Sequence, residues 1–326
     1  MENDDRLIDI LSQSKDYVSG QELANRFNVS RTAIWKQIKG LRSRGFDIDA
    51  IPHQGYRLVS YPNKLLPSAV KNGLTTTFIG QEMHHYQVLD STNIQAKRLA
   101  EEGAPEGTVV ASELQMMGKG RSGRHWMSPE SESILTSIIL RPQFLPHQVS
   151  QLAILATLSC AEAINKCTGI KAVPLWPNTI LANNRKVGGV LVEFGGDLDQ
   201  VAYVILGIGI NVNFNASKFD EIAGQATSLS EVVGRKVSRI HLFQLLLQQI
   251  ESDYCFLLDN GFSMICDRWI AACGIKGELV SVDCRTGTTM GIVDGIDEYG
   301  SLILATENGM NLVPIGSLAS IKIGIG

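Results

Sequence analysis

The sequence lacks the patterns typical of membrane-spanning, secreted and metal-binding proteins. No apolar run approaches the roughly 18 residues that a membrane-spanning helix needs. Acidic residues precede the first apolar ones, so no signal peptide is expected. The six cysteines include no CxxC pair, which argues against a metal site and indicates reduced thiols. We therefore expect a cytoplasmic protein without a membrane partner and without a tightly bound metal.

Catalytic and nucleic-acid signatures are also sparse. A Walker loop, GxxxxGK followed by Ser or Thr, is absent. No Ser/His/Asp or Cys/His arrangement indicates a covalent nucleophile. The net charge is −4, so any surface for nucleic acid must be local. With 326 residues, of which 44% are hydrophobic and 19% are charged, the chain is long enough for two or three domains.

Residues 1–64 show the order of elements of a winged helix-turn-helix. A first helix carries Leu7 and Leu11 on one face. A second helix follows Ser19, whose spacing to Glu22 is that of a capping box, and a third follows Ser30. Two β-like runs, 46–51 and 56–59, complete the segment as a hairpin. Helix, helix, turn, helix and hairpin together predict this DNA-binding fold.

The third helix carries the local positive charge. Residues 30–44 contain five Lys and Arg residues and no acid. A helix presented to the major groove needs cations for phosphates and small polar groups at its N-terminal end. The charge alone would also suit a solvated face of a structural helix, but the turn and the hairpin favour DNA binding. The predicted contacts are Ser30, Arg31, Thr32, Lys36 and Lys39.

The remainder of the chain divides near residue 274. Residues 65–274 alternate strand-like runs such as 134–140 and 187–194 with helices such as 148–166 and 241–258, which predicts a central α+β domain with a mixed sheet. Residues 275–326 hold four short strand-like runs with glycine-containing turns, which predicts a small all-β barrel. The fold class is thus a multidomain α+β protein.

The loop from Gly118 to Trp126 is the most informative stretch, and it reads Gly-Lys-Gly-Arg-Ser-Gly-Arg-His-Trp. Glycines let a backbone approach a ligand closely and present its amides. Cations on the same loop make it suitable for a phosphate chain or an acyl phosphate, and Trp126 offers a plate for a ring system. A flexible basic surface loop is the alternative for this pattern taken alone.

Five segments, in order along the chain, resemble motifs of the biotin–protein ligases. The loop, with Gln115 before it, is similar to the family's GRGRRGRxW. The other four are Asp90-Ser91-Thr92-Asn93 (family DSTN), Trp176-Pro177-Asn178 (KWPND), residues 185–193 (RKxxGILxE) and residues 207–212 (GIGINV). The first domain resembles that of the bifunctional, repressor-type members, and the last domain resembles their small SH3-like barrel. The resemblance spans nearly the whole chain.

The resemblance implies roles for particular residues. Lys186, Arg121 and Arg124 would be catalytic, since they would face the carboxylate and the phosphates. The biotin and adenylate site would consist of Ser91, Thr92, Asn93, Gln115, Gly118, Lys119, Gly120, Arg121, Trp126, Lys186, Gly189, Gly207, Gly209 and Asn211.

The reaction implied by the family is the formation of biotinyl-5′-adenylate from biotin and ATP, helped by Mg²⁺, followed by transfer to a lysine. Fixed cations suit the charge that grows on the phosphoryl oxygens. The implied partners are the biotin carboxyl carrier domain of acetyl-CoA carboxylase and operator DNA of biotin genes. We also expect a homodimer promoted by ligand, because ordering of the glycine loop by the adenylate can create a dimer surface.

Several positions in these motifs depart from the family pattern. Lys119 stands where the loop has its first arginine, which keeps the charge but loses the planar fork. Leu175 and Thr179 stand where the KWPND motif has Lys and Asp, and Ser122 replaces one of the paired loop arginines. Leu175 and Thr179 keep open the alternative of a winged-helix biotin sensor with degraded ligase activity. The shared architecture keeps open a lipoate-type ligase of the same fold, against which the glycine loop argues.

Overall fold

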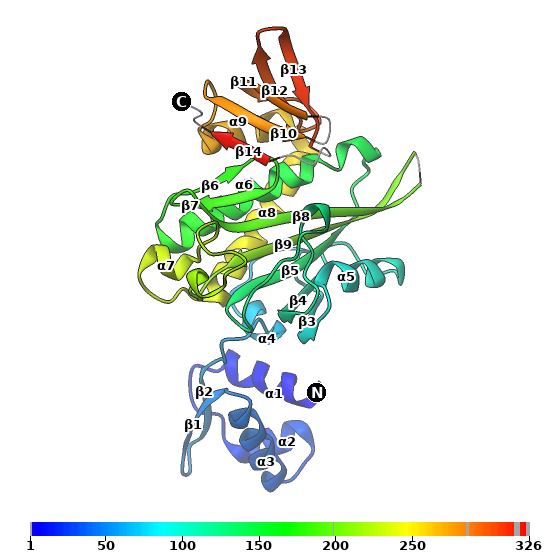
Figure 1. The fold of residues 1–326 in the computed structure, drawn as a ribbon. Helices are drawn as coiled ribbons and strands as arrows, with labels where there is room; N and C mark the ends of the chain where they lie inside the picture. Colours follow the sequence, from blue (N-terminus) through cyan, green and yellow to red (C-terminus); the bar gives the residue numbers. More distant parts are fainter. Residues whose placement is uncertain (1, 198, 285–286, 316–319, 324–326) are drawn as a thin grey trace. The chain divides into compact units, whose positions relative to one another are not determined.

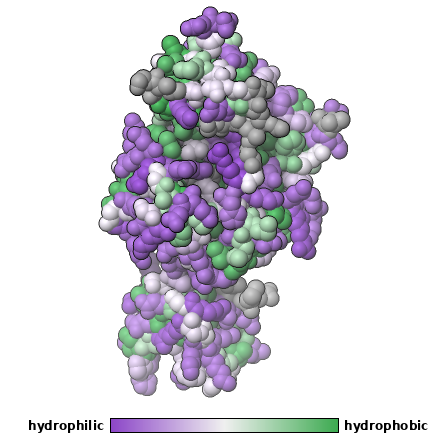
Figure 2. Space-filling model, in the orientation of Figure 1, coloured by the Kyte–Doolittle hydropathy of each residue, from purple (hydrophilic) through white to green (hydrophobic). Residues whose placement is uncertain are grey.

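The computed structural model describes residues 2–197, 199–284, 287–315 and 320–323, except for the side chains of residues 2, 5, 122 and 320. They belong to two compact units, Met1–Gly73 and Leu74–Gly326. Figure 1 colours the chain from blue to red along the sequence. Figure 2 shows a face on which polar side chains prevail and hydrophobic ones form small groups. In the part of the chain described, no helix has the length and apolar character to cross a membrane.

The first unit packs its helices α1, α2 and α3 around one apolar core, and a short fourth helix follows the hairpin. Ser19 caps α2 by accepting from the amide of Glu22, and Ser30 caps α3 by accepting from the amide of Ala33. Asn28, in the left-handed conformation, makes the turn between the two helices. This arrangement confirms the predicted helix-turn-helix. The helices are α1 (Glu2–Gln13), α2 (Gly20–Phe27), α3 (Arg31–Ser43) and the short α4 (Pro67–Lys71).

A hairpin follows the third helix, where the sequence predicts the wing. Strands β1 (Asp47–Ile51) and β2 (Gly55–Ser60) are antiparallel, and Tyr56 also forms a bridge with Val18. Gly55 has φ +126°, and a Cβ there would lie 2.0 Å from the Val18 carbonyl oxygen. A glycine is therefore required where the hairpin meets the segment between α1 and α2.

A seven-stranded mixed sheet forms the centre of the second unit, as predicted. Its order is β3-β4-β5-β9-β8-β7-β6, with β3 and β4 parallel and every other pair antiparallel. The strands are β3 (Met83–Leu89), β4 (Val109–Gln115), β5 (Ser133–Leu140), β6 (Ala172–Leu175), β7 (Thr179–Ala182), β8 (Arg185–Gly196) and β9 (Val201–Asn211).

Helices cover both faces of this sheet. The helix α5 packs its Ala96 and Ala100 on Val110, Ile139 and Ile205. The other face is covered by α6 and α8, which lie behind the sheet in Figure 1. The helices are α5 (Thr92–Glu101), α6 (Gln151–Thr168), α7 (Leu229–Val233), α8 (Arg239–Asn260) and α9 (Ser263–Cys273).

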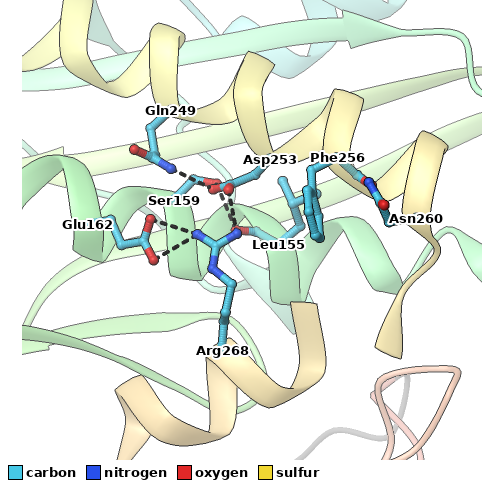
Figure 3. A network of polar contacts seen from close by, with 8 residues as sticks. All are labelled: Leu155, Ser159, Glu162, Gln249, Asp253, Phe256, Asn260 and Arg268. Carbon is cyan, nitrogen blue, oxygen red and sulfur yellow. Dashed lines mark hydrogen bonds and ion pairs between the residues drawn. The ribbon is translucent and has the colours of Figure 1, made fainter. Parts of the chain in front are cut away.

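A network of charges joins α6, α8 and α9. Figure 3 shows Arg268 of α9 between Glu162 of α6 and Asp253 of α8, at 2.8 Å from each carboxylate. Asp253 also accepts from Ser159 and from Gln249. Because both acids are partnered by one guanidinium, the three helices are fixed to one another at the back of the sheet.

The last strands form an antiparallel sheet with the order β13-β12-β11-β10-β14. The predicted all-β character is confirmed. In the described residues, however, the two edge strands β13 and β14 do not pair with each other, so the sheet is not closed. Closure into an SH3-like barrel stays a prediction. The strands are β10 (Leu279–Cys284), β11 (Gly287–Ile296), β12 (Leu302–Thr306), β13 (Gly309–Val313) and β14 (Ser320–Ile323).

Candidate functional site

A pocket of about 930 Å³ opens on the face of the sheet where α5 begins. Its floor includes Gly189, Gly207 and Gly209 of β8 and β9, which are neighbours in the antiparallel register. The glycine loop, residues 118–126, forms one wall and the ends of β6 and β7 form another. We call this cavity the ligand pocket. A second cavity of about 980 Å³ adjoins it and shares much of the glycine loop.

The glycine loop is closed by its own backbone. Trp126 donates its amide to the Gly118 carbonyl at 2.8 Å, and Gly120 donates to Arg124 at 2.7 Å. A Cβ at Gly118 would lie 2.5 Å from the Trp126 carbonyl oxygen, so this closure requires glycine there. The side chain of Arg121 donates to the carbonyl of Ile315, which attaches the loop to the segment after β13.

Trp126 lies directly on the glycine floor. A Cβ at Gly209 would come within 2.6 Å of the indole ring, and one at Gly189 within 3.3 Å. The amine of Lys186 stands 5.3 Å from the centre of the same ring. The glycines therefore make room first for a side chain of the protein, which in turn offers a flat apolar surface inside the pocket.

A chain of hydrogen bonds fixes the start of α5 against the sheet. Gln115 accepts from the amide and hydroxyl of Thr92, and the Thr92 hydroxyl accepts from Ser137. Asn93 accepts from Ser137 at 2.6 Å and donates to Glu193 at 2.7 Å. These hydrogen bonds hold the side chains of Thr92 and Asn93 in place, where they form part of the pocket wall.

Among the described residues, Lys119, Arg121, Arg124 and Lys186 are the Lys and Arg side chains that line the ligand pocket. Burial, and after it the charge of Arg124, holds the pKa of Lys186 below its ordinary value. The same two causes lower the pKa of Arg121. Cations whose pKa is lowered by burial and by a neighbouring cation are suited to receive an anion, because its charge offsets both the burial and the repulsion.

Acids are fewer in the pocket than cations. Among the described lining residues they are Glu221 and Asp283. No three His, Cys, Asp or Glu side chains in the described parts of the chain are grouped to hold a metal ion. The pocket therefore carries excess positive charge where a polyanion would bind.

The backbone of Lys186 is held by the segment before α7. Lys186 donates to the Gln225 carbonyl and accepts from the amide of Thr227. Asn211, which is buried, donates to the Thr227 carbonyl at 3.0 Å, and its Oδ1 atom accepts no hydrogen bond from the described part of the chain. Asn211 thus supports the strand position of Lys186 from below, and it does not line the pocket in the described residues.

The structure brings together most of the residues singled out in the sequence. Gly118 does not line the ligand pocket but borders the adjoining cavity. Leu175 and Thr179, which differ from the family motif, do line the ligand pocket. The residues that line it are Ser91, Thr92, Asn93, Gln115, Lys119, Gly120, Arg121, Arg124, Trp126, Lys186, Gly189, Gly207 and Gly209.

Sequence reasoning missed the supports of the site. Ser137 lies inside an apolar strand and Glu193 ends a motif to which no contact was assigned. Glu221, Asp283 and Cys284 line the pocket from loops and from β10. A polar residue in the middle of an apolar run, as at Ser137, is the one signal that could have been used.

The second candidate site is the outer face of α3. Arg31, Thr32, Lys36 and Lys39 are exposed there, and Ser30 caps the helix. The other two cations of the segment are engaged inside the unit, since Arg42 donates to the Ile48 carbonyl and Arg44 pairs with Asp4. Both remain exposed, but each already has a partner within the unit, so Arg31, Lys36 and Lys39 are the cations of this helix best placed to meet a ligand.

Comparison with known proteins finds matches for the segments that contain both candidate sites. An HTH domain matches residues 5–57, and the biotin/lipoate A/B protein ligase family matches residues 86–211. The bifunctional ligase/repressor BirA of Bacillus subtilis is 38% identical over 310 residues, which cover 94% of this chain and 95% of that protein. The biotin–[acetyl-CoA-carboxylase] ligase of Paracoccus denitrificans is 32% identical over 229 residues, covering 69% of this chain and 95% of that one.

A solved structure agrees with this placement. The biotin protein ligase of Aquifex aeolicus, in complex with biotin and ATP, superposes with a TM-score of 0.66 at 28% identity, covering 75% of this chain and 100% of that one. The resemblance drawn from the five motifs is thereby confirmed. The chain belongs to the family of biotin–protein ligases, in its bifunctional ligase/repressor branch.

Proposed function

We propose that the ligand pocket activates biotin with ATP and transfers it to a lysine of a biotin carboxyl carrier domain. The observation that carries the proposal is the convergence of Arg121, Arg124 and Lys186 around an apolar floor covered by Trp126. Such a site accepts a ring system on one side and a phosphate chain on the other.

In the first step the biotin carboxylate attacks the α-phosphorus of ATP. The new bond gives biotinyl-5′-adenylate, and the bond to diphosphate breaks. Negative charge grows on the phosphoryl oxygens, and cations already fixed around the pocket stabilise it without reorganisation. Lys186 is suited to this task because its backbone is held on both sides and its amine lies over the Trp126 ring.

In the second step the amine of the acceptor lysine attacks the acyl carbon of the adenylate. An amide forms, AMP leaves, and the amine loses its proton to solvent. The glycine loop shields the mixed anhydride from water in the meantime. This scheme requires no covalent enzyme intermediate.

Mg²⁺ would enter with the nucleotide. The ion is usually held by one or two carboxylates together with substrate phosphates. Glu221 and Asp283, the acids that line the pocket in the described residues, fit such a limited role. The ion would neutralise part of the triphosphate charge.

The first domain would make the protein a repressor of biotin genes. Ser30, Arg31, Thr32, Lys36 and Lys39 would contact operator DNA, and adenylate would promote a homodimer that binds paired half-sites. Under this proposal residues 1–64 bind DNA, residues 65–274 catalyse, and residues 275–326 close as a small barrel over the pocket rim.

A sensor with weak catalysis is the second candidate. The observation that favours it is that Leu175 and Thr179, which replace charged residues of the family, line the ligand pocket. The other alternative, a lipoate-type ligase, is not favoured, because the relatives named above are biotin ligases. Loss of charge at the pocket wall would slow adenylation while leaving biotin binding in place.

A transfer assay separates the two candidates. Purified protein is incubated with labelled biotin, ATP, Mg²⁺ and a biotin-acceptor domain, beside an active ligase as control. Labelled acceptor supports the ligase. Absence of label over hours at micromolar enzyme, with biotin binding retained by calorimetry, would establish the sensor instead.

A further inference from the structure

The outer face of α3 carries a large apolar side chain among its cations. Trp35 has 52% of its surface exposed, whereas Ile34 and Ile38, its neighbours on the inner face, are completely buried. Tryptophan is enriched at the centres of interfaces, and an exposed tryptophan surrounded by polar and charged side chains is therefore a candidate contact residue. The core of the first unit does not account for this residue.

The position of Trp35 lies in the part of the helix that meets base edges. It follows Arg31 by one helical turn and precedes Lys39 by one, so the three side chains form a single stripe. In a helix-turn-helix, residues in the N-terminal half of the recognition helix contact bases. Cations on either side would contact phosphates, which would place the indole between them, over the groove floor.

Lys39 restricts the orientation of the indole. Its amine lies 5.5 Å from the ring centre of Trp35, a cation–π contact between residues four apart. A ring held in this way loses less conformational freedom on binding than a freely rotating one. The ring therefore presents an apolar face rather than only its single N–H donor.

The major groove offers one apolar feature to such a face. Base edges there present hydrogen-bond donors and acceptors, except for the C5-methyl group of thymine. We infer that Trp35 reads a thymine methyl group in each half-site of the DNA that this protein binds. The inference rests on the proposed DNA-binding function and adds sequence specificity to it.

The test removes one methyl group at a time. Full-length protein with biotin and ATP selects duplexes from a randomised library, and each thymine of the selected duplex is then replaced by deoxyuridine, which keeps the hydrogen-bonding groups. For the unaltered protein we expect one thymine per half-site whose replacement weakens binding about fourfold, the effect of one buried methyl group.

Two variants connect that thymine with the side chain. Trp35→Ala should bind the selected duplex about tenfold more weakly and lose the response to deoxyuridine, since Trp residues at interface centres are frequently dominant contacts. Trp35→Phe keeps an aromatic face without the N–H donor and should keep the response. Both should retain biotin transfer and thermal stability, which shows that they are folded.

A phosphate-contact variant is the matched control. Lys36→Gln should weaken binding to selected and unrelated duplexes alike and leave the deoxyuridine response unchanged. If Trp35→Ala keeps the same response as the unaltered protein, or weakens all duplexes equally, the assignment is overturned while DNA binding stands. If the unaltered protein selects no duplex, the DNA-binding function fails and the assignment fails with it.

Discussion

Replacement of Gly207 by alanine should destabilise the second unit through a single contact. A Cβ at this position would lie 2.0 Å from Oδ1 of Asn93, so the amide must leave its place. It then loses the bond from Ser137 and the bond to Glu193. Each such bond contributes on the order of 1 kcal/mol. Residual crowding in a packed site adds about 1 kcal/mol or more, which gives about 3 kcal/mol in total.

A double-mutant cycle isolates this mechanism. Asn93→Ala alone gives up the same hydrogen bonds, but in the Gly207→Ala background it also removes the crowded atom. We therefore expect the double variant to be about as stable as Asn93→Ala, with a coupling of about 3 kcal/mol, the whole effect of Gly207→Ala. The free energy of unfolding is measured in urea by tryptophan fluorescence, since Trp126, Trp176 and Trp269 all lie in the second unit.

A glycine in open space serves as the control. In the described residues, apart from its two chain neighbours, no heavy atom lies within 4 Å of a Cβ built at Gly295, and its φ is outside the range that disfavours side chains. Gly295→Ala should change the free energy of unfolding by less than about 0.5 kcal/mol. If the effects of Gly207→Ala and Asn93→Ala simply add, the proposed contact between the two residues is not the cause, and the reasoning is refuted.

Other predictions concern catalysis and DNA binding. Lys186→Ala should lower pyrophosphate release about a hundredfold without loss of fold, because removing one preorganised donor costs on the order of 3 kcal/mol; an unchanged rate would contradict the assignment. Since the pKa of Lys186 is lowered, rising pH removes its charge earlier than in an ordinary lysine, so pyrophosphate release should decline at a lower pH in the unaltered protein than in Lys186→Arg. Thr179→Asp, which restores the family's carboxylate at the pocket wall, should raise activity or alter its Mg²⁺ dependence; identical titrations would exclude Thr179 from the phosphate shell. Arg31→Ala should abolish the gel shift at low protein concentration while biotin transfer continues, and equal loss of both activities would indicate misfolding instead.

The sequence predicts local structure well where one face of an element is apolar. The caps at Ser19 and Ser30 set two helix starts in the first unit, and the long strands β5, β8 and β9 are found where continuous apolar runs occur. The strands β6 and β7 have four residues each, too few for a repeating pattern, and were not predicted.

The site could be predicted only where its residues lie in consecutive motifs. The glycine loop and the strand containing Lys186 are of this kind. Ser137 and Glu193 meet Asn93 only through the register of β5, β8 and β9, which no local pattern specifies. The same holds for Asp283, which reaches the pocket rim from the last sheet. Contacts between strands that are distant in the sequence arise only when the sheet has folded, so local sequence patterns do not predict them.

The bond between Arg121 and Ile315 links residues 194 positions apart. During synthesis the glycine loop therefore leaves the ribosome long before its attachment point exists. Closing so large a loop carries an entropy cost that grows only slowly with length, but it postpones the contact until nearly all intervening segments are in place. Attachment of the glycine loop to the segment after β13 is in this way a late step of folding, although the loop itself can close earlier through its own backbone.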